Sequence, residues 1–253
     1  MKISQNLVLI SLCTIVFSGC AAKREIVSLP ESVQKEIKST DVYIEECEKK
    51  VKADIETSNI GTYGGGGLLL ALVDCAVMSH RDNCADDALT CVQNDVATFD
   101  FQEKFSKKIE RKLQDTNWLH AQKINHITGI NDEAHQEIFK KTNTDCVLTS
   151  KFIYKLNPQL NVLRGTLYLT LYPTSEKIKK MVNATDSLET PIFKFHIAAT
   201  QSLPEATKEI EENAKLWAQN NGALLKQSLE NIFNQVFDNL DKILNAPNHL
   251  PGE

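Results

Sequence analysis

Residues 162–172 read VLRGTLYLTLY, and this stretch decides the fold. Leucines alternate with polar or aromatic side chains, which is the period of a strand with one buried face. The two sets are Leu163, Leu167, Leu169 and Leu171 on one face, and Arg164, Thr166, Tyr168 and Thr170 on the other. The alternation predicts a strand whose leucine face is covered by other elements.

Two further stretches predict strands beside this one. Residues 145–156 (DCVLTSKFIYKL) are dense in β-formers, and residues 192–200 place alternate apolar side chains on one face. Asn157-Pro158 marks the turn between the first two strands, and the sequence favours a loop over residues 173–190. These strands form the centre of the expected sheet.

The rest of the chain supplies helices and weaker strands. The sequence predicts helices over 102–115 and 131–141, a strand over 120–128 and an edge strand over 41–56. A long helix is expected from about 205 to 244, with an apolar stripe that covers the sheet or, in a second interpretation, contacts another subunit. We therefore expect an α+β fold in which helices pack a mixed sheet of about four to five strands.

A glycine run separates this region from an apolar segment. Gly64, Gly65, Gly66 and Gly67 precede residues 68–78 (LLLALVDCAVM), and no Lys-Ser/Thr pair follows them, so a hinge is favoured over a phosphate loop. Residues 68–78 and 84–96 predict a helical hairpin. Residues 68–77 are too short to span a bilayer and are expected either in the core or, because of the hinge, at an interface.

The first twenty residues carry the clearest functional signal. Lys2 precedes an apolar run, residues 7–17 (LVLISLCTIVF), and Ser18-Gly19-Cys20 follow. This resembles the lipobox of Gram-negative bacterial lipoproteins, although Phe17 replaces the usual aliphatic residue. The resemblance implies cleavage before Cys20, a thioether-linked diacylglyceryl group on its thiol, and fatty acylation of the new amine with chains such as palmitate. Ala21, which is not Asp, resembles the outer-membrane sorting pattern.

These features give an expected domain organisation. Residues 1–19 form the signal peptide, 20–39 the lipidated N-terminus and a tether, 40–246 a single α+β periplasmic domain, and 247–253 a tail. The protein is expected at the outer membrane with its domain facing the periplasm. At the level of topology, the domain is similar to those of the curli-secretion lipoprotein and the Tol N-terminal domain.

Composition and cysteine spacing exclude several function classes. The formal net charge of −5 over 253 residues argues against a nucleic-acid binder. Cys75 and Cys91 are symmetric about the hairpin turn, so an antiparallel hairpin could join them in a disulfide, with free buried thiols as the alternative. The spacing of cysteines and histidines matches no zinc pattern, and we expect no metal or other cofactor.

No catalytic motif stands out in the sequence. It contains no GxSxG elbow and no HExxH pattern. We therefore expect a non-enzymatic binding or assembly module that meets a protein partner in the envelope. Two alternatives remain: an oligomeric secretion or pore-associated lipoprotein that uses residues 64–78 as a membrane or subunit contact, and a hydrolase of envelope polymers.

Overall fold

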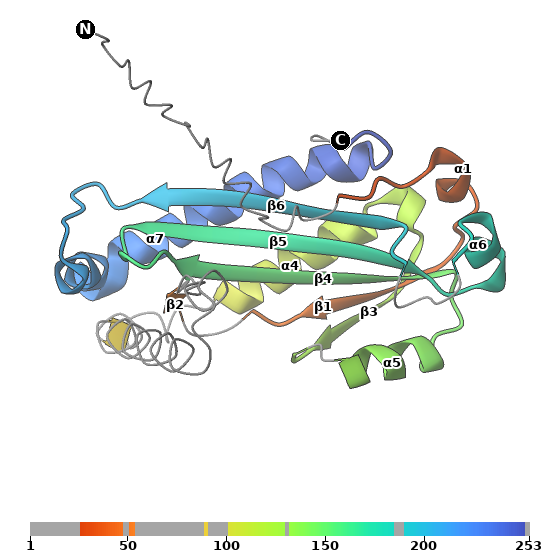
Figure 1. Ribbon diagram of the computed structural model, residues 1–253, viewed down its shortest axis with the longest axis horizontal. Coiled ribbons are helices and arrows are strands. Elements are labelled where there is room, and N and C mark those ends of the chain that lie inside the picture. The colour runs from red at the N-terminus through yellow and green to blue at the C-terminus, as the bar shows by residue number, and fades with distance from the viewer. Residues whose placement is uncertain are drawn as a thin grey trace, which may run out of the picture.

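The computed structural model describes residues 26–47, 51–53, 89–90, 101–129, 132–184 and 190–250 (Figure 1). Its strands in chain order are β1 Thr40–Glu45, β2 Lys52–Ala53, β3 Ala121–Ile127, β4 Cys146–Leu156, β5 Val162–Pro173 and β6 Phe193–Ser202. The helices are α1 Glu31–Gln34, α4 Phe101–Gln114, the 3₁₀ turn η1 Asn117–Leu119, α5 Asp132–Lys141, α6 Glu176–Met181 and α7 Ile210–Asn245. The α+β class expected from the sequence is confirmed.

All the described strands join one mixed sheet in the order β3-β1-β4-β5-β6, with β2 paired to the far end of β4. The pairs β1–β3 and β1–β4 are parallel, whereas β4–β5 and β5–β6 are antiparallel hairpin neighbours. The prediction of an edge strand over residues 41–56 is wrong for β1, which lies between β3 and β4, whereas β2 in the same range pairs with β4 alone. The acidic side chains of β1 are tolerated inside the sheet because Asp41 accepts a hydrogen bond from Thr142 Oγ1 (2.6 Å) and Glu45 is ion-paired with Lys151 (2.6 Å).

Helices α4 and α7 lie side by side on one face of the sheet, behind it in Figure 1. The leucine face of β5 points toward them, as the alternation predicts, and all four leucines are buried. Phe105 of α4 packs against Phe152 of β4 and against Phe233 and Phe237 of α7, with ring centroids 5.2–6.3 Å apart. Gly165 sits in the middle of β5 where Ile232 and Phe152 approach the backbone closely. This aromatic layer is the centre of the core.

The long C-terminal helix is broken where the sequence predicts one continuous element. Residues 219–222 leave the helical region, and Asn220, Asn221 and Gly222 have φ values of 52°, 58° and 69°. Asn and Gly are the residues that adopt the left-handed region at least cost, so an Asn-Asn-Gly sequence permits the break. The expected apolar stripe is buried against the chain's own sheet, which confirms that this helix covers the sheet.

Residues 26–39, which the sequence analysis assigns to the tether, pack into the domain. Val27 forms an antiparallel bridge with Lys194 of β6, and the Leu29 amide donates to the carbonyl of Pro247 (2.9 Å). Leu29, Val33 and Ile37 are buried. Residues 26–39 therefore belong to the domain, and α1 caps one end of it.

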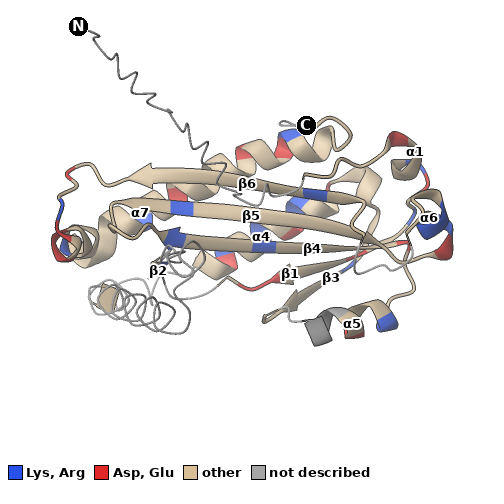
Figure 2. Cartoon of the chain, viewed as in Figure 1, with Lys and Arg blue, Asp and Glu red and all other residues tan. Residues whose placement is uncertain are grey.

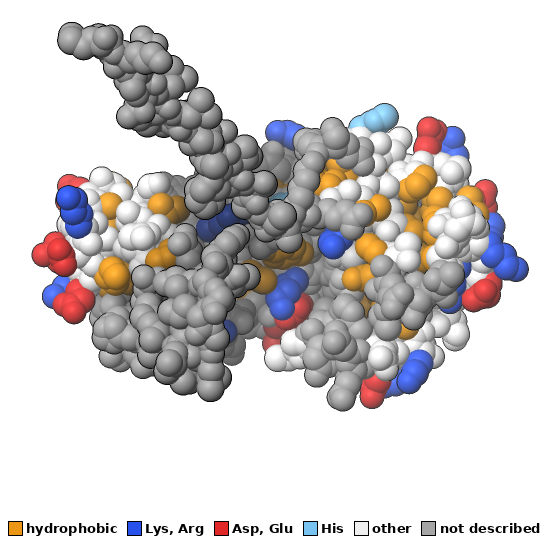
Figure 3. Space-filling view, viewed as in Figure 1, with side chains coloured by type: hydrophobic (Ala, Val, Ile, Leu, Met, Phe, Trp, Pro, Cys, Tyr) orange, Lys and Arg blue, Asp and Glu red, His pale blue; other side chains and the backbone are white. Residues whose placement is uncertain are grey.

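The second face of the sheet is mostly uncovered by described helices. Only near one end does α5 pack on it, where the Phe139 ring meets the Tyr172 ring edge-on at 5.5 Å. Lys and Arg residues lie on this face of β4 and β5, and Lys155 is directly opposite Arg164 (Figure 2). Basic side chains reach the surface in the middle of this side of the molecule (Figure 3). We call it the open face, meaning the face that the described helices leave largely uncovered, and it carries the polar and basic side chains of β4 and β5.

Candidate functional site

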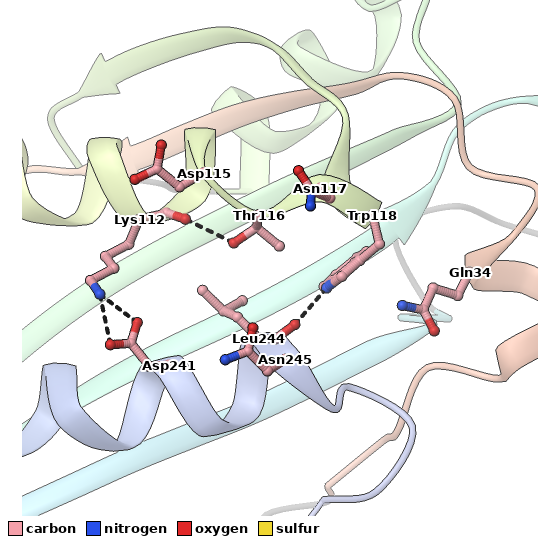
Figure 4. Close-up of a pocket in the computed structure, with 9 residues that line it drawn as sticks. All are labelled: Gln34, Lys112, Asp115, Thr116, Asn117, Trp118, Asp241, Leu244 and Asn245. Atoms are coloured by element: carbon pink, nitrogen blue, oxygen red, sulfur yellow. Dashed lines mark hydrogen bonds and ion pairs between the residues drawn. The ribbon is translucent and has the colours of Figure 1, made fainter.

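A pocket of about 410 Å³ lies where the C-terminal ends of α4 and α7 meet, and we call it the α4–α7 pocket (Figure 4). Its walls come from the end of α4 and η1, the last turns of α7, and Gln34 of α1. The nine lining residues are Gln34, Lys112, Asp115, Thr116, Asn117, Trp118, Asp241, Leu244 and Asn245. Three segments far apart in the sequence thus build one concave site.

Trp118 is the fixed aromatic wall of this pocket. Its Nε1–H donates to the carbonyl oxygen of Leu244 (2.7 Å), one of the last carbonyls of α7, which have no partner within the helix. The indole also meets the ring of Phe193 edge-on at 6.2 Å, and Trp118 is only partly buried. Because both contacts hold the ring, its orientation is set before any ligand arrives.

An ion pair closes one side of the pocket. Lys112 Nζ of α4 lies 2.6 Å from the carboxylate of Asp241 of α7, and Figure 4 shows this pair and Gln34 on opposite sides of Trp118. Thr116 Oγ1 donates to the carbonyl of Lys112 (2.8 Å). The Lys112 and Asp241 charges are about one third to one half exposed, so the pair fixes the spacing of the two helices more than it adds stability.

Three amide side chains in the lining are open to solvent, because Gln34 is half-buried and Asn117 and Asn245 are exposed. Those of Gln34, Asn117 and Asn245 form no hydrogen bond with any residue in the described part of the chain. Asp115 has only a long contact, 3.9 Å, with Arg111 Nε. These groups are the ones that the pocket can offer to a ligand.

The nine lining residues include no Ser, Cys or His. The familiar side-chain nucleophiles other than Thr, Lys and Asp are therefore missing, and the Thr116 hydroxyl and the Lys112 ammonium are both engaged with neighbours. What the arrangement supplies is a rigid aromatic surface surrounded by hydrogen-bonding groups, which suits recognition.

A second, smaller pocket of about 300 Å³ lies between β6 and the last turns of α7. Its lining includes His196, Lys242 and His249, and the His196 ring stacks on Tyr168 at 6.1 Å. It lies close to the point where the chain enters the domain, because Val27 pairs with Lys194, two residues from His196. Five residues lie between Cys20 and Ile26, so the Cα atoms of these two residues are at most about 20 Å apart.

None of the site residues expected from the sequence is among the described residues that line either pocket. Cys20, the proposed disulfide partners Cys75 and Cys91, and the hinge glycines Gly64, Gly65, Gly66 and Gly67 all lie outside the described residues. So does the predicted hairpin of residues 68–96 except for Leu89 and Thr90, which are helical, with Leu89 buried. These predictions stay predictions.

Among the described cysteines, Cys47 and Cys146 are buried free thiols. Burial raises the pKa of the Cys47 thiol to about 12 and also raises the pKa of Cys146, so neither is an activated nucleophile. No three described His, Cys, Asp or Glu side chains are grouped as metal ligands. None of the described helices combines the length and hydropathy needed to cross a membrane.

Comparisons with known proteins add little to this site. No family model and no curated protein matches the sequence. The hypothetical protein CT253 of Chlamydia trachomatis aligns over 82% of this chain and 99% of its own, with 10% identity and a TM-score of 0.31. A Helicobacter pylori protein described as a homolog of the neuraminyllactose-binding hemagglutinin aligns over 82% and 90%, with 11% identity and a TM-score of 0.26. Similarity this low informs neither fold nor function.

Proposed function

We propose that this protein is a lipid-anchored component of the bacterial cell envelope that works as a non-enzymatic binding module. The observation that carries the proposal is the N-terminal sequence, in which a Lys, an eleven-residue apolar run and Ser-Gly lead directly to Cys20. Only a thiol at that position can form the thioether to a diacylglyceryl group, and several acyl chains give a durable anchor.

The structure of the domain is compatible with this role. The described part of the domain includes residues from Ile26 onward, so only five residues separate the proposed anchor from it. The anchor would keep the domain close to one membrane surface and would raise the effective concentration of weak ligands and partners there. The α4–α7 pocket, with its aromatic wall and amide side chains, supplies a place for recognition.

Fatty-acid labelling of the full-length protein in a Gram-negative host tests the anchor. We expect wild type to incorporate labelled palmitate and to fractionate with the outer membrane, and Cys20→Ala to lose the label. Cys13→Ala is the matched control, because this cysteine lies inside the apolar run and should not affect labelling. Absence of label from wild type, or label that survives Cys20→Ala, would refute the proposal.

A further inference from the structure

The α4–α7 pocket has the dimensions of a small-molecule site. Its volume of about 410 Å³ falls within the range of roughly 300–1,000 Å³ found for ligand pockets. The charge of the lining, its amide side chains and its aromatic wall each limit which chemical class of ligand it can bind.

The charge of the lining disfavours anions. One cation, Lys112, faces two carboxylates, and its charge is already neutralised by Asp241 at 2.6 Å. Asp115 adds a further negative charge that only a 3.9 Å contact with Arg111 offsets. A phosphate or carboxylate ligand would meet net repulsion here, so the ligand is neutral or cationic.

The amide side chains in the lining favour a neutral ligand over a cationic one. Gln34, Asn117 and Asn245 each present an acceptor oxygen and two donor hydrogens. A cation such as a quaternary ammonium group has no lone pair to accept those donors, and seating it would remove water from them without compensation. A purely apolar ligand would do the same. Hydroxyl groups both donate and accept, and so can use every amide in the lining.

The aromatic wall completes the match. The Trp118 ring is flat, apolar and held in place by its contacts with Leu244 and Phe193. A pyranose ring has an apolar C–H face that can lie against such a ring while its equatorial hydroxyls point outward to polar groups. We propose that the α4–α7 pocket binds a neutral saccharide, with Trp118 under the sugar ring and Gln34, Asn117 and Asn245 on its hydroxyls.

The two tryptophans of the chain make this testable at the site itself. Trp118 Nε1–H lies in the pocket, whereas Trp217 is fully buried and donates to the Leu160 carbonyl (2.6 Å), so its indole signal is an internal reference. ¹⁵N-labelled full-length protein in a detergent without a sugar head group is titrated with cellobiose and with N,N′-diacetylchitobiose. We expect one of these disaccharides to shift the Trp118 indole signal saturably and to leave that of Trp217 in place.

Variants then assign the contacts. Asn117→Ala and Asn245→Ala should each weaken the binding of that disaccharide roughly three- to tenfold, the loss expected for one uncharged hydrogen bond. Asn231→Ala, on an exposed position of α7 outside the pocket, is the matched control and should leave Kd unchanged. An unshifted Trp217 signal shows that each variant is folded.

Three results would overturn the inference: neither disaccharide shifts Trp118 at millimolar concentration, tetramethylammonium shifts it more strongly than both disaccharides, or Asn231→Ala weakens binding as much as Asn117→Ala. The inference rests on the proposed binding role and not on the lipid anchor. Saccharide binding and fatty-acid labelling therefore succeed or fail independently.

Discussion

The two faces of the sheet differ in how tightly their side chains are packed. On the covered face, Phe105, Phe152 and Phe237 interlock with almost no exposure, whereas on the open face of the same strands Thr149 and Thr170 lie opposite each other and remain partly exposed. The strands are common to both faces, so the backbone hydrogen bonds cannot explain a difference between them. We infer that coverage by α4 and α7 determines how much free energy of unfolding a side-chain substitution removes.

The largest expected effect is the loss of an aromatic ring from the covered face. Phe105→Ala should lower the free energy of unfolding by about 3–5 kcal/mol, because it leaves a cavity among Phe152, Phe233 and Phe237. Urea denaturation measures this as a lower midpoint with an unchanged slope.

Thr170→Ala on the open face is the control for Phe105→Ala. It removes part of one cross-strand pair, and we expect a loss of about 1 kcal/mol or less. Equal losses for the two variants would mean that the faces do not differ in packing.

The covered face is also the part of the fold that the sequence predicts best. Residues 145–156, 162–172 and 192–200 appear as β4, β5 and β6 with their boundaries shifted by at most two residues. Strict alternation of apolar and polar side chains leaves only one register that buries the apolar set, which explains this accuracy.

Short and strained elements were missed for a different reason. The helix α6 lies in the predicted loop of residues 173–190, and its only local signal is Ser175, whose Oγ accepts from the Ile178 amide (3.4 Å). The break at residues 219–222 interrupts a strong helical period, and only the Asn-Asn-Gly sequence pointed to it. An apolar repeat that continues over many residues predicts one helix and does not reveal a break of four residues within it.

The α4–α7 pocket was not predictable from local pattern at all. Gln34, Trp118 and Asn245 are brought together because Leu29 binds Pro247 and Trp118 binds Leu244 across the fold. Long-range contacts of this kind leave no periodic mark in the sequence.

Gly165→Ala adds a methyl group to the covered face, whereas Phe105→Ala removes a ring from it. A Cβ on Gly165 would lie 2.5 Å from Ile232 Cγ2 and 2.8 Å from Phe152 Cζ, so Gly165→Ala should cost about 1–3 kcal/mol of unfolding free energy. Denaturant unfolding of the full-length protein measures the loss. Ala198→Val adds carbon atoms to an exposed position of β6 and should cost little.

A double-mutant cycle sharpens this result. Ile232→Ala opens space beside the new methyl group, so Gly165→Ala with Ile232→Ala should cost about 0.5–3 kcal/mol less than the sum of the two single changes. Simple additivity would show that the two side chains do not compete for the same space.

Exclusion of water from buried acidic groups also makes the stability of the fold depend on pH. Burial raises the pKa of the Cys47 thiol from 9.0 to about 12, so the folded protein keeps this proton over a range in which the unfolded chain releases it. The stabilisation is therefore complete below about pH 9 and is lost progressively as the pH rises toward 12. Burial also raises the pKa of Cys146, Tyr43 and Tyr172, which contribute with the same sign.

Urea unfolding of wild type and Cys47→Ala at pH 8, 9, 10 and 11 under reducing conditions isolates this contribution. We expect the free energy of unfolding to fall less steeply above pH 9 in Cys47→Ala, because one buried acid has been removed, while the two proteins show parallel behaviour below that pH. The comparison uses the slopes with pH, so any packing change caused by Ala cancels. Identical slopes above pH 9 would mean that water already reaches Cys47 in the folded state, and that the covered side of the sheet is less closed than its packing indicates.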